Sequence, residues 1–264
     1  MLLAVDIGNS NICIGGLESC TVCFTARMVT RPHCTADEYA AELKFLLDRL
    51  ETDPRTFTGV IVCSVVPGLT KVLSAACRKL TGLDALAVTH TLDTGLRFAV
   101  DAPEKVGRDR IADAAAAAAL YSLPCMTVDL GTATTYNVIS ADRTFLVGFI
   151  VPGVQTSLRA ISAGTAQLPP IAPEPPAVLI GRNTVECLNN GAIFGTAAML
   201  DGLADRVEQR LGQPLTIVAT GGLAPCIIPC CRRQVIYDAD LLFKGLALIE
   251  ERSRSPIVHS SEQL

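Results

Sequence analysis

Two short stretches of the chain combine an aspartate, a glycine and small hydroxyl or amide side chains at the end of an apolar segment. They read Asp6-Ile-Gly-Asn-Ser and Asp129-Leu-Gly-Thr-Ala-Thr-Thr. Gly8 and Gly131 lack the Cβ that keeps a ligand off the backbone, and the polar neighbours are short donors. Such loops suit phosphate oxygens, and a carboxylate at the strand end suits a cation such as Mg²⁺, which binds one or two carboxylates together with phosphates. An ordinary Asp-Gly turn is the alternative, and its repetition makes that alternative weaker.

A third stretch, Gly107-Arg-Asp-Arg, precedes an alanine-rich helix predicted from Ile111 to Tyr121. Free amides at a helix start and two arginines suit an anionic group such as a carboxylate. Composition alone favours a simpler interpretation, in which Asp109 caps the helix and the arginines are solvated. Asp113 lies one turn after Asp109 on the same face, and two like charges at that spacing hint at a cation or an arginine between them.

The elements around these residues predict an α/β fold. Each Asp-x-Gly is expected to end the first strand of a β-hairpin, and strands alternate with helices after the first hairpin. The repeated hairpin implies two related domains with mixed sheets flanked by helices, at 1–115 and 116–252, followed by a mobile tail at 253–264. A long helix is expected from Val185 to about Leu211. Its small residues permit close packing against another helix, namely Gly191, Ala192, Gly195 and Ala198.

Composition excludes several classes of protein. Half of the 264 residues are apolar, which is incompatible with a disordered or fibrous chain. The net charge is −4, with 22 basic and 26 acidic residues, and there is no basic run, so nucleic acid is not an expected partner. Apolar runs are too short to span a bilayer and the first residues lack the order of a signal peptide, so we expect no membrane partner and a cytoplasmic location.

The chain contains 11 cysteines, an odd number. Most have apolar neighbours, which favours free thiols used as small core residues; examples are Cys13, Cys63, Cys125 and Cys187. Metal binding or redox chemistry is the less favoured alternative for two clusters, Cys20 with Cys23, and Cys226 with Cys230 and Cys231.

Taken together, the motifs resemble those of the type III pantothenate kinases, a family within the superfamily of actin, sugar kinases and heat-shock chaperone ATPases. The resemblance extends from Asp6 to Gly245, and its specificity comes from the order of the motifs. Besides the three stretches above they are Cys63-Ser-Val-Val-Pro, Ile150-Val-Pro-Gly, Thr165-Ala-Gln-Leu-Pro, Gly181-Arg-Asn-Thr and Thr220-Gly-Gly-Leu-Ala.

The resemblance implies two ribonuclease H-like domains and a kinase that phosphorylates the hydroxyl of pantothenate with ATP. The product is 4'-phosphopantothenate, in the first step of coenzyme A synthesis. Asp109 is implied as the general base, Asp6 as a ligand of ATP-bound Mg²⁺, and Asp129 as the holder of a monovalent cation, K⁺ or NH₄⁺. The family also implies a homodimer that completes the pantothenate pocket across its interface.

The resemblance further implies two sets of binding residues. Those for ATP are Asp6, Ile7, Gly8, Asn9, Ser10, Asn11, Ile12, Cys13, Thr132, Gly221 and Gly222, the last two beside the adenine. Those for pantothenate are Val100, Gly107, Arg108, Asp109, Arg110 and Thr184, with Arg110 a natural partner of the substrate carboxylate.

The chain departs from the family pattern at six positions. Ser10 replaces a threonine, Arg108 a small residue, Val100 an aromatic residue, Val147 a glycine, Asn137 an aspartate and Asn190 a serine. If Arg108 points inward, it is expected to lower the proton affinity of Asp109. Two alternatives to the main interpretation are a superfamily kinase for another small hydroxyl substrate and a non-catalytic regulatory relative. The presence of Asp6, Asp109 and Asp129 together argues against the second.

Overall fold

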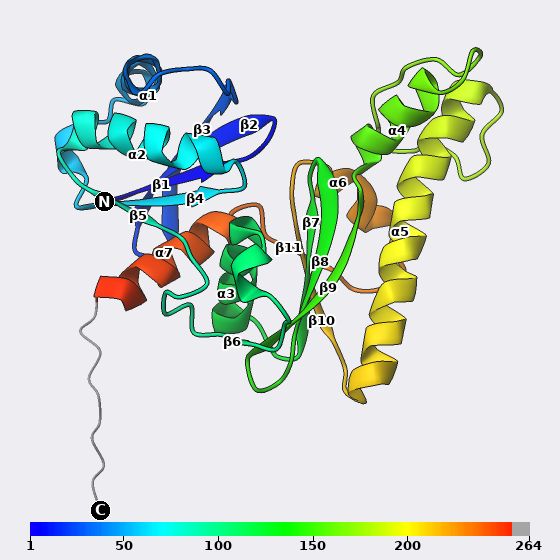
Figure 1. Ribbon diagram of the computed structural model, residues 1–264. Helices are drawn as coiled ribbons and strands as arrows, with labels where there is room; N and C mark the ends of the chain where they lie inside the picture. The colour runs from blue at the N-terminus through cyan, green and yellow to red at the C-terminus, as the bar shows by residue number, and fades with distance from the viewer. Residues whose placement is uncertain (255–264) are drawn as a thin grey trace, which may run out of the picture. The chain divides into compact units, whose positions relative to one another are not determined.

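The computed structural model describes residues 1–254, which divide into two compact units (Figure 1). Within this range the first unit comprises Met1–Gly95, Ala102–Ala116 and the chain from Leu242 onward, and the second comprises Leu96–Asp101 and Ala117–Leu241. The predicted boundary at 115/116 falls beside one of these divisions, whereas the last helix groups with the first unit. The assignment of two domains stays a prediction.

The first unit is built on a five-stranded sheet in the order β3-β2-β1-β4-β5. β1 is antiparallel to β2 and parallel to β4, so the sheet is mixed. The elements are β1 (Leu2–Ile7), β2 (Asn11–Glu18), β3 (Thr21–Val29), α1 (Ala36–Arg49), η1 (Pro54–Thr56), β4 (Gly59–Ser64), α2 (Pro67–Thr81), β5 (Ala85–Ala87), η2 (Pro103–Lys105), the first part of α3 (Arg108–Leu120) and nearly all of α7 (Leu241–Arg254).

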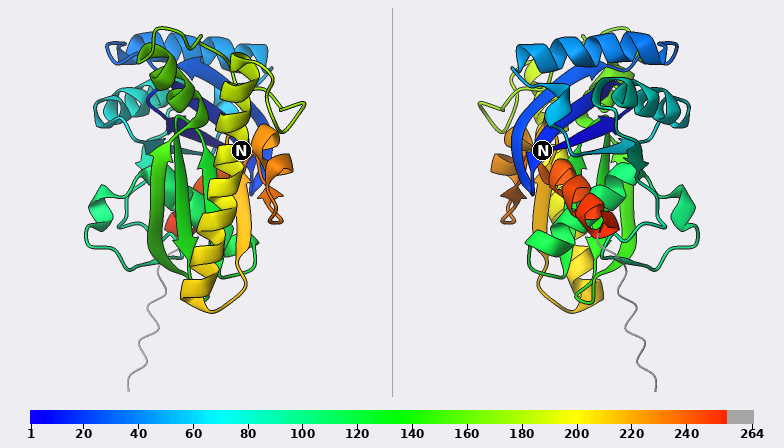
Figure 2. Two further views of the ribbon diagram at one scale, coloured as in Figure 1. Left: turned by 90° about the vertical axis from the view of Figure 1, so that its right-hand side faces the viewer. Right: turned by 90° about the vertical axis from the view of Figure 1, so that its left-hand side faces the viewer.

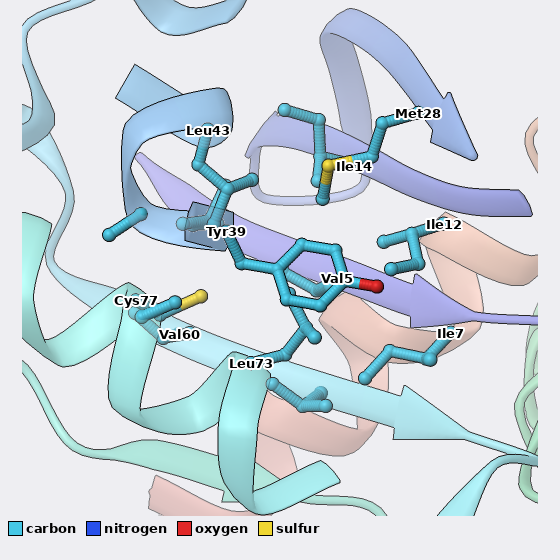
Figure 3. Close-up of a cluster of buried hydrophobic side chains, with 14 of the residues drawn as sticks. Val5, Ile7, Ile12, Ile14, Met28, Tyr39, Leu43, Val60, Leu73 and Cys77 are labelled. Atoms are coloured by element: carbon cyan, nitrogen blue, oxygen red, sulfur yellow. The ribbon is translucent and has the colours of Figure 1, made fainter. Parts of the chain in front are cut away.

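Alternation along β1 assigns its side chains to the two faces of this sheet. Val5 and Ile7 belong to a buried cluster with Tyr39 of α1 and with Leu73 and Cys77 of α2 (Figure 3). α1 begins with a capping box, in which Thr35 and Glu38 each accept a hydrogen bond from the other's backbone N–H. The two helices therefore cover one face, and Asp6 lies on the other.

α3 and α7 pack on the Asp6 side of the first unit. A Cβ on Gly15 of β2 would lie 3.0 Å from the Phe243 ring of α7, and Gly15 pairs with Ala4. At Gly245 of α7, a Cβ would lie 1.9 Å from the Ala112 carbonyl oxygen of α3. Only glycine permits that close approach of the two helices.

The second unit repeats the topology of the first. Its sheet has the order β11-β10-β7-β8-β9-β6, and without the edge strand β6 this is the order of the first sheet. The elements are β6 (Arg97–Phe98), the end of α3, β7 (Cys125–Leu130), β8 (Ala133–Ile139), β9 (Thr144–Pro152), α4 (Val154–Ala163), α5 (Thr184–Leu211), β10 (Thr216–Thr220), α6 (Ala224–Ile227), η3 (Ile228–Cys230) and β11 (Ile236–Tyr237). Asp6 and Asp129 are each the next-to-last residue of the equivalent strand.

α5 runs along one face of the second sheet (Figure 2). Met126, Val128 and Leu130 of β7 share a buried cluster with apolar residues of α5 such as Ile193 and Leu200. By the alternation of the strand, Asp129 lies on the opposite face. The two halves thus present equivalent aspartates away from their main cores.

Several boundaries and one burial prediction differ from the sequence-based expectation. α3 begins at Arg108, not Ile111, and α5 begins at Thr184, not Val185, with Asn183 as its N-cap. α7 extends to Arg254, so residues 253 and 254 of the predicted tail are helical, and 255–264 lie outside the described residues.

All 11 cysteines have free thiols, but Cys187 is exposed, so its prediction as a core residue is wrong. None of the helices within residues 1–254 has the length and apolarity needed to cross a membrane.

Candidate active site

The first Asp-x-Gly loop is a tight connection between β1 and β2. Gly8 N donates to Asn11 O (3.0 Å), and the tip residues Asn9 and Ser10 are exposed. Thr30, directly after β3, fastens the loop: its Oγ1 donates to Gly8 O (2.7 Å) and its N donates to Ser10 O (3.1 Å). Thr30 was not predicted, because only the pairing of β2 with β3 brings it to the loop.

Asp6 lies in a row of paired side chains across the first sheet. It pairs with Cys13 of β2 and with Cys63 of β4, and Cys13 pairs with Arg27 of β3. Paired residues on adjacent strands point to the same face, so all of these side chains share the Asp6 side of the sheet. Ile7 and Ile12 of the predicted ATP set are buried on the other side and shape the loop through packing.

The Cys63 side chain joins the first loop to the start of α3. It is fully buried, it hydrogen-bonds to Asp6, and it interacts electrostatically with Asp6, Asp109 and Asp113. Burial and then these carboxylates raise the pKa of the thiol well above its usual value, so it is neutral. The structure therefore brings Asp6 and Asp109 into one neighbourhood of the first unit, as a shared site requires.

Asp109 has the electrostatic character of a general base. It is the second residue of α3 and is half-buried, and its Oδ1 accepts a hydrogen bond from Arg110 N (2.8 Å). Burial raises the pKa of the Asp109 carboxyl, although this hydrogen bond and the Arg110 charge oppose the rise. A carboxylate with a raised pKa accepts a proton more readily than an ordinary aspartate.

Gly107 leaves space for the Asp109 carboxylate. A Cβ on Gly107 would lie 2.4 Å from Asp109 Oδ1, well inside van der Waals contact. Gly107 also supplies the carbonyl that accepts from Ile111 N (3.1 Å). Its place in the motif follows from the space that the aspartate needs.

Arg108 does not point toward Asp109. Its guanidinium donates to the carbonyls of Val106 (3.0 Å) and Glu104 (3.1 Å), so it ties the start of α3 to η2. The charge that acts on Asp109 comes from the buried Arg110, and the net effect on the Asp109 pKa is a rise. Arg108 was expected to lower the proton affinity of Asp109 only if it pointed inward, and it does not point inward.

In the second unit, Asp129 packs on glycine backbone. A Cβ on Gly221 would lie 2.7 Å from Asp129 Oδ1, and one on Gly131 would lie 3.4 Å from Oδ2. Gly221 also has φ +93°, a left-handed conformation that favours glycine. Gly221 thus makes room for Asp129, whereas Gly222 is exposed with open space around its Cα.

The other predicted residues of the second unit lie on separate elements. Thr132 is exposed in the β7–β8 loop, and its carbonyl accepts from Gly153 N (3.1 Å) and Thr156 Oγ1 (2.7 Å). Val100 follows β6 and is partly buried, and Thr184 is exposed at the first position of α5. Their contacts with substrates stay predictions.

Two departures from the family pattern have clear structural roles. Asn137 is fully buried, and its Nδ2 donates to Thr127 Oγ1 (2.8 Å) on the paired strand. Asn190 is buried in α5, and its Nδ2 donates to the carbonyls of Val178 (2.7 Å) and Leu179 (3.2 Å). The first amide stabilises the hairpin of the second loop, and the second holds the segment before α5.

Comparison with known proteins identifies the family. The chain matches the type III pantothenate kinase family over residues 2–206. It is 38% identical to a type III pantothenate kinase of Roseiflexus sp. (strain RS-1), with 97% of this chain and 100% of the relative covered. It is 36% identical to one of Bacillus cytotoxicus, with coverages of 96% and 97%.

The chain belongs to the type III pantothenate kinases. The predictions of family, of a phosphotransferase acting on an alcohol and of pantothenate phosphorylation in coenzyme A biosynthesis are therefore confirmed.

Solved structures confirm the predicted fold class of this pantothenate kinase. A putative Baf family transcriptional activator from Campylobacter jejuni superposes with a TM-score of 0.61 at 20% identity, with 94% of this chain and 97% of that chain covered. The ethanolamine utilization protein EutJ from Carboxydothermus hydrogenoformans superposes with a TM-score of 0.54 at 16% identity, with coverages of 94% and 89%. At such identities the likeness concerns the fold alone.

The donor atoms at the two aspartates of this kinase fit hard cations. Within residues 1–254, no group of three or more His, Cys, Asp or Glu side chains is arranged to hold a metal ion by itself. Mg²⁺ bound mainly through ATP phosphates needs only one or two carboxylates, and the carboxylate of Asp6 has the chemistry of such a ligand. At Asp129, the glycine backbone of Gly131 and Gly221 lets the carboxylate pack closely against the main chain, and a carboxylate oxygen is a suitable ligand for such a cation.

Proposed function

We propose that this kinase transfers the γ-phosphoryl group of ATP to the pantothenate hydroxyl with Asp109 as the general base. The observation that carries the assignment is the half-buried Asp109 carboxyl with its raised pKa, in one neighbourhood with Asp6 around Cys63. Asp109 accepts the hydroxyl proton, the substrate oxygen bonds to the γ-phosphorus, and the bond to the ADP oxygen breaks.

The first loop is the proposed phosphate cradle of ATP. Gly8, Asn9 and Ser10 present backbone and short polar groups at an exposed turn that Thr30 fixes. Asp6 would hold Mg²⁺, which when bound neutralises charge on the phosphates. The protein contributes a loop and a carboxylate whose positions are set before ATP arrives, so that less ordering is needed on binding.

The monovalent cation is proposed to bind at Asp129. This carboxylate is equivalent in the fold to Asp6, and it packs on the backbone of Gly221 beside the second loop. K⁺ or NH₄⁺ there would add positive charge next to the second loop, where Thr132 is proposed to bind ATP. Gly222, exposed and without a side chain, is the better placed of the two glycines to border the adenine.

Pantothenate is proposed to bind at Gly107 to Arg110, with its carboxylate on Arg110. The enzyme is proposed to act in the cytoplasm.

A reaction assay tests the function. ADP release by the purified protein is followed in the presence of Mg-ATP, with and without pantothenate, first in K⁺ and then in Na⁺. We expect ADP release that requires both pantothenate and K⁺ or NH₄⁺. Asp109→Asn should slow this release by about 10²- to 10⁴-fold. ADP release without pantothenate would point to another hydroxyl substrate, and no release under any condition to a regulatory relative.

A homodimer is proposed through the exposed side of α5 and the segments beside it. Gly191, Gly195 and Ala198 form an exposed stripe along α5, and a Cβ at either glycine would contact nothing in the protomer. Large apolar side chains before and at the start of α5 are also exposed: Leu179 (69%), Ile180 (81%) and Val185 (49%). Small residues permit close helix packing, and exposed apolar side chains mark interaction surfaces.

Gly195→Arg tests the dimer, because the protomer has room for the side chain. We expect wild type to sediment as a dimer and the variant as a folded monomer. The matched variant Gly68→Arg, also in open space but in α2, should remain dimeric. A wild-type monomer at micromolar concentration would contradict the proposal.

A further inference from the structure

We propose that Cys63 is a positioning residue, which orients the Asp6 carboxylate for Mg-ATP through a hydrogen bond from its buried thiol. This inference rests on the proposed role of Asp6. It adds a function for a residue that lies on the strand next to the phosphate loop.

The strand register places the thiol beside the carboxylate. β1 and β4 are parallel neighbours, and Asp6 pairs directly with Cys63. Both side chains therefore point to the same face, and the Cys63 side chain has no exposed surface. Its hydrogen bond to Asp6 is consequently sheltered from competing water.

The neutrality of the donor matters at this position. Cys63 also interacts electrostatically with Asp109 and Asp113, so three carboxylates act on one thiol. A lysine or arginine in its place would compete with the cation that Asp6 is proposed to bind, whereas a thiol donates a hydrogen bond without adding charge. The residue thus restrains Asp6 and leaves its negative charge available.

Cys13, on the other side of Asp6, does not have the same role. It is only half-buried, its side chain hydrogen-bonds to Arg27, and the Asp6 charge raises the pKa of its thiol. The two cysteines that flank Asp6 are therefore distinguishable, because Cys63 is fully buried and hydrogen-bonds to Asp6, whereas Cys13 hydrogen-bonds to Arg27.

Three variants separate hydrogen bonding from packing. Cys63→Ser keeps a donor, Cys63→Val fills the space without one, and Cys77→Val places the same change in the apolar core between α1, α2 and the sheet. Equilibrium binding of ATP is measured by calorimetry, once with Mg²⁺ and once with EDTA, so the readout does not depend on turnover. Thermal melts confirm that each variant is folded.

We expect Cys63→Val to weaken Mg-ATP binding roughly five- to tenfold, with little change in EDTA, because the lost restraint acts on Asp6. Cys63→Ser should stay within about twofold of wild type, and so should Cys77→Val. The inference would be overturned if Cys63→Val bound Mg-ATP as tightly as wild type. It would also be overturned if Cys63→Ser bound Mg-ATP as weakly as Cys63→Val. If Mg²⁺ gives wild type itself no gain in ATP affinity, the Asp6 assignment fails, and this inference with it.

Discussion

The Asp109 carboxylate occupies the space into which a side chain at Gly107 would project. A Cβ on Gly107 would lie 2.4 Å from Asp109 Oδ1. The two residues thus compete for the same space, so a side chain at Gly107 would displace the Asp109 carboxylate. This relationship makes the position of Asp109 testable without changing the aspartate.

Gly107→Ala should lower kcat by displacing Asp109. A methyl group at 2.4 Å from Oδ1 forces the carboxylate or the helix start to move. Because small displacements of a catalytic group are costly, we expect a loss of about 100-fold. Mg-ATP affinity, which depends on the first loop, should change little. Gly68→Ala, where a Cβ meets nothing within 4 Å, is the matched control and should retain full activity.

The pH profile should report the raised pKa of Asp109. A general base acts only when ionised, so kcat/KM should fall as the pH drops through this pKa, at a higher pH than for an ordinary aspartate. The Arg110 charge lowers the Asp109 pKa, and Arg110→Gln should move the acidic limb to still higher pH. Profiles of kcat/KM, measured from pH 4 to 8 at intervals of roughly half a pH unit, check both expected positions of the acidic limb. A limb that stays in place or moves down would show that Asp109 is not the titrating base.

Asp109→Asn should lower kcat by about 10²- to 10⁴-fold and raise the melting temperature near neutral pH. A carboxyl whose folded-state pKa is raised above its unfolded value destabilises the fold when ionised, and that cost disappears as the pH falls below both values. Asparagine removes the buried charge, and its side-chain oxygen can still accept the hydrogen bond from Arg110 N. Melting curves at neutral and acidic pH should show the gain only at neutral pH, and an equal gain at both would contradict the argument. Asp84→Asn, at an exposed site, should change neither activity nor melting.

Thr30→Val should weaken ATP binding by loosening the first loop. It removes the donor to Gly8 O and leaves that carbonyl without this partner, which we expect to raise the KM for ATP about fivefold. Thr30→Ser keeps the hydroxyl and should restore the wild-type value. The KM for pantothenate serves as the internal reference, and a parallel change in both constants would indicate general distortion.

The sequence predicted the fold well wherever the information was local. Each Asp-x-Gly hairpin combines an apolar strand with a turn signal, and both aspartates occupy the same place in equivalent strands. The start of α3 was misplaced because Gly107-Arg-Asp-Arg was interpreted as a segment before the helix. The helix begins at Arg108, since Ile111 N already bonds to Gly107 O and charged residues are tolerated in a first turn.

Features that depend on register or torsion were not predictable. Cys63 was noticed as part of a motif, but its contact with Asp6 follows from the pairing of strands more than 50 residues apart in the sequence. Gly221 was expected to lie beside the adenine, and that stays a prediction; its positive φ and its packing on Asp129 could not be expected from the motif. Side-chain pattern alone carries neither kind of information.

Val147 occupies a backbone conformation that suits glycine. It has φ +66°, and the register of β8 with β9 shifts between Asn137 and Ile139, so Leu146 and Val147 together face one residue of β8. This is a β-bulge, and one of its types places glycine in the left-handed conformation. The departure from the family glycine at this position therefore has an energetic consequence, because a β-branched residue is strained there.

Val147→Gly should stabilise the protein by about 1 kcal/mol, since the relief of left-handed strain exceeds the entropy that glycine loses on folding. Urea unfolding measures the change. Val151→Gly makes the same substitution in the same strand without a positive φ, and it should destabilise because Val151 packs against the core of the second unit. Loss of stability in both variants would mean that the packing of the Val147 side chain outweighs its backbone strain.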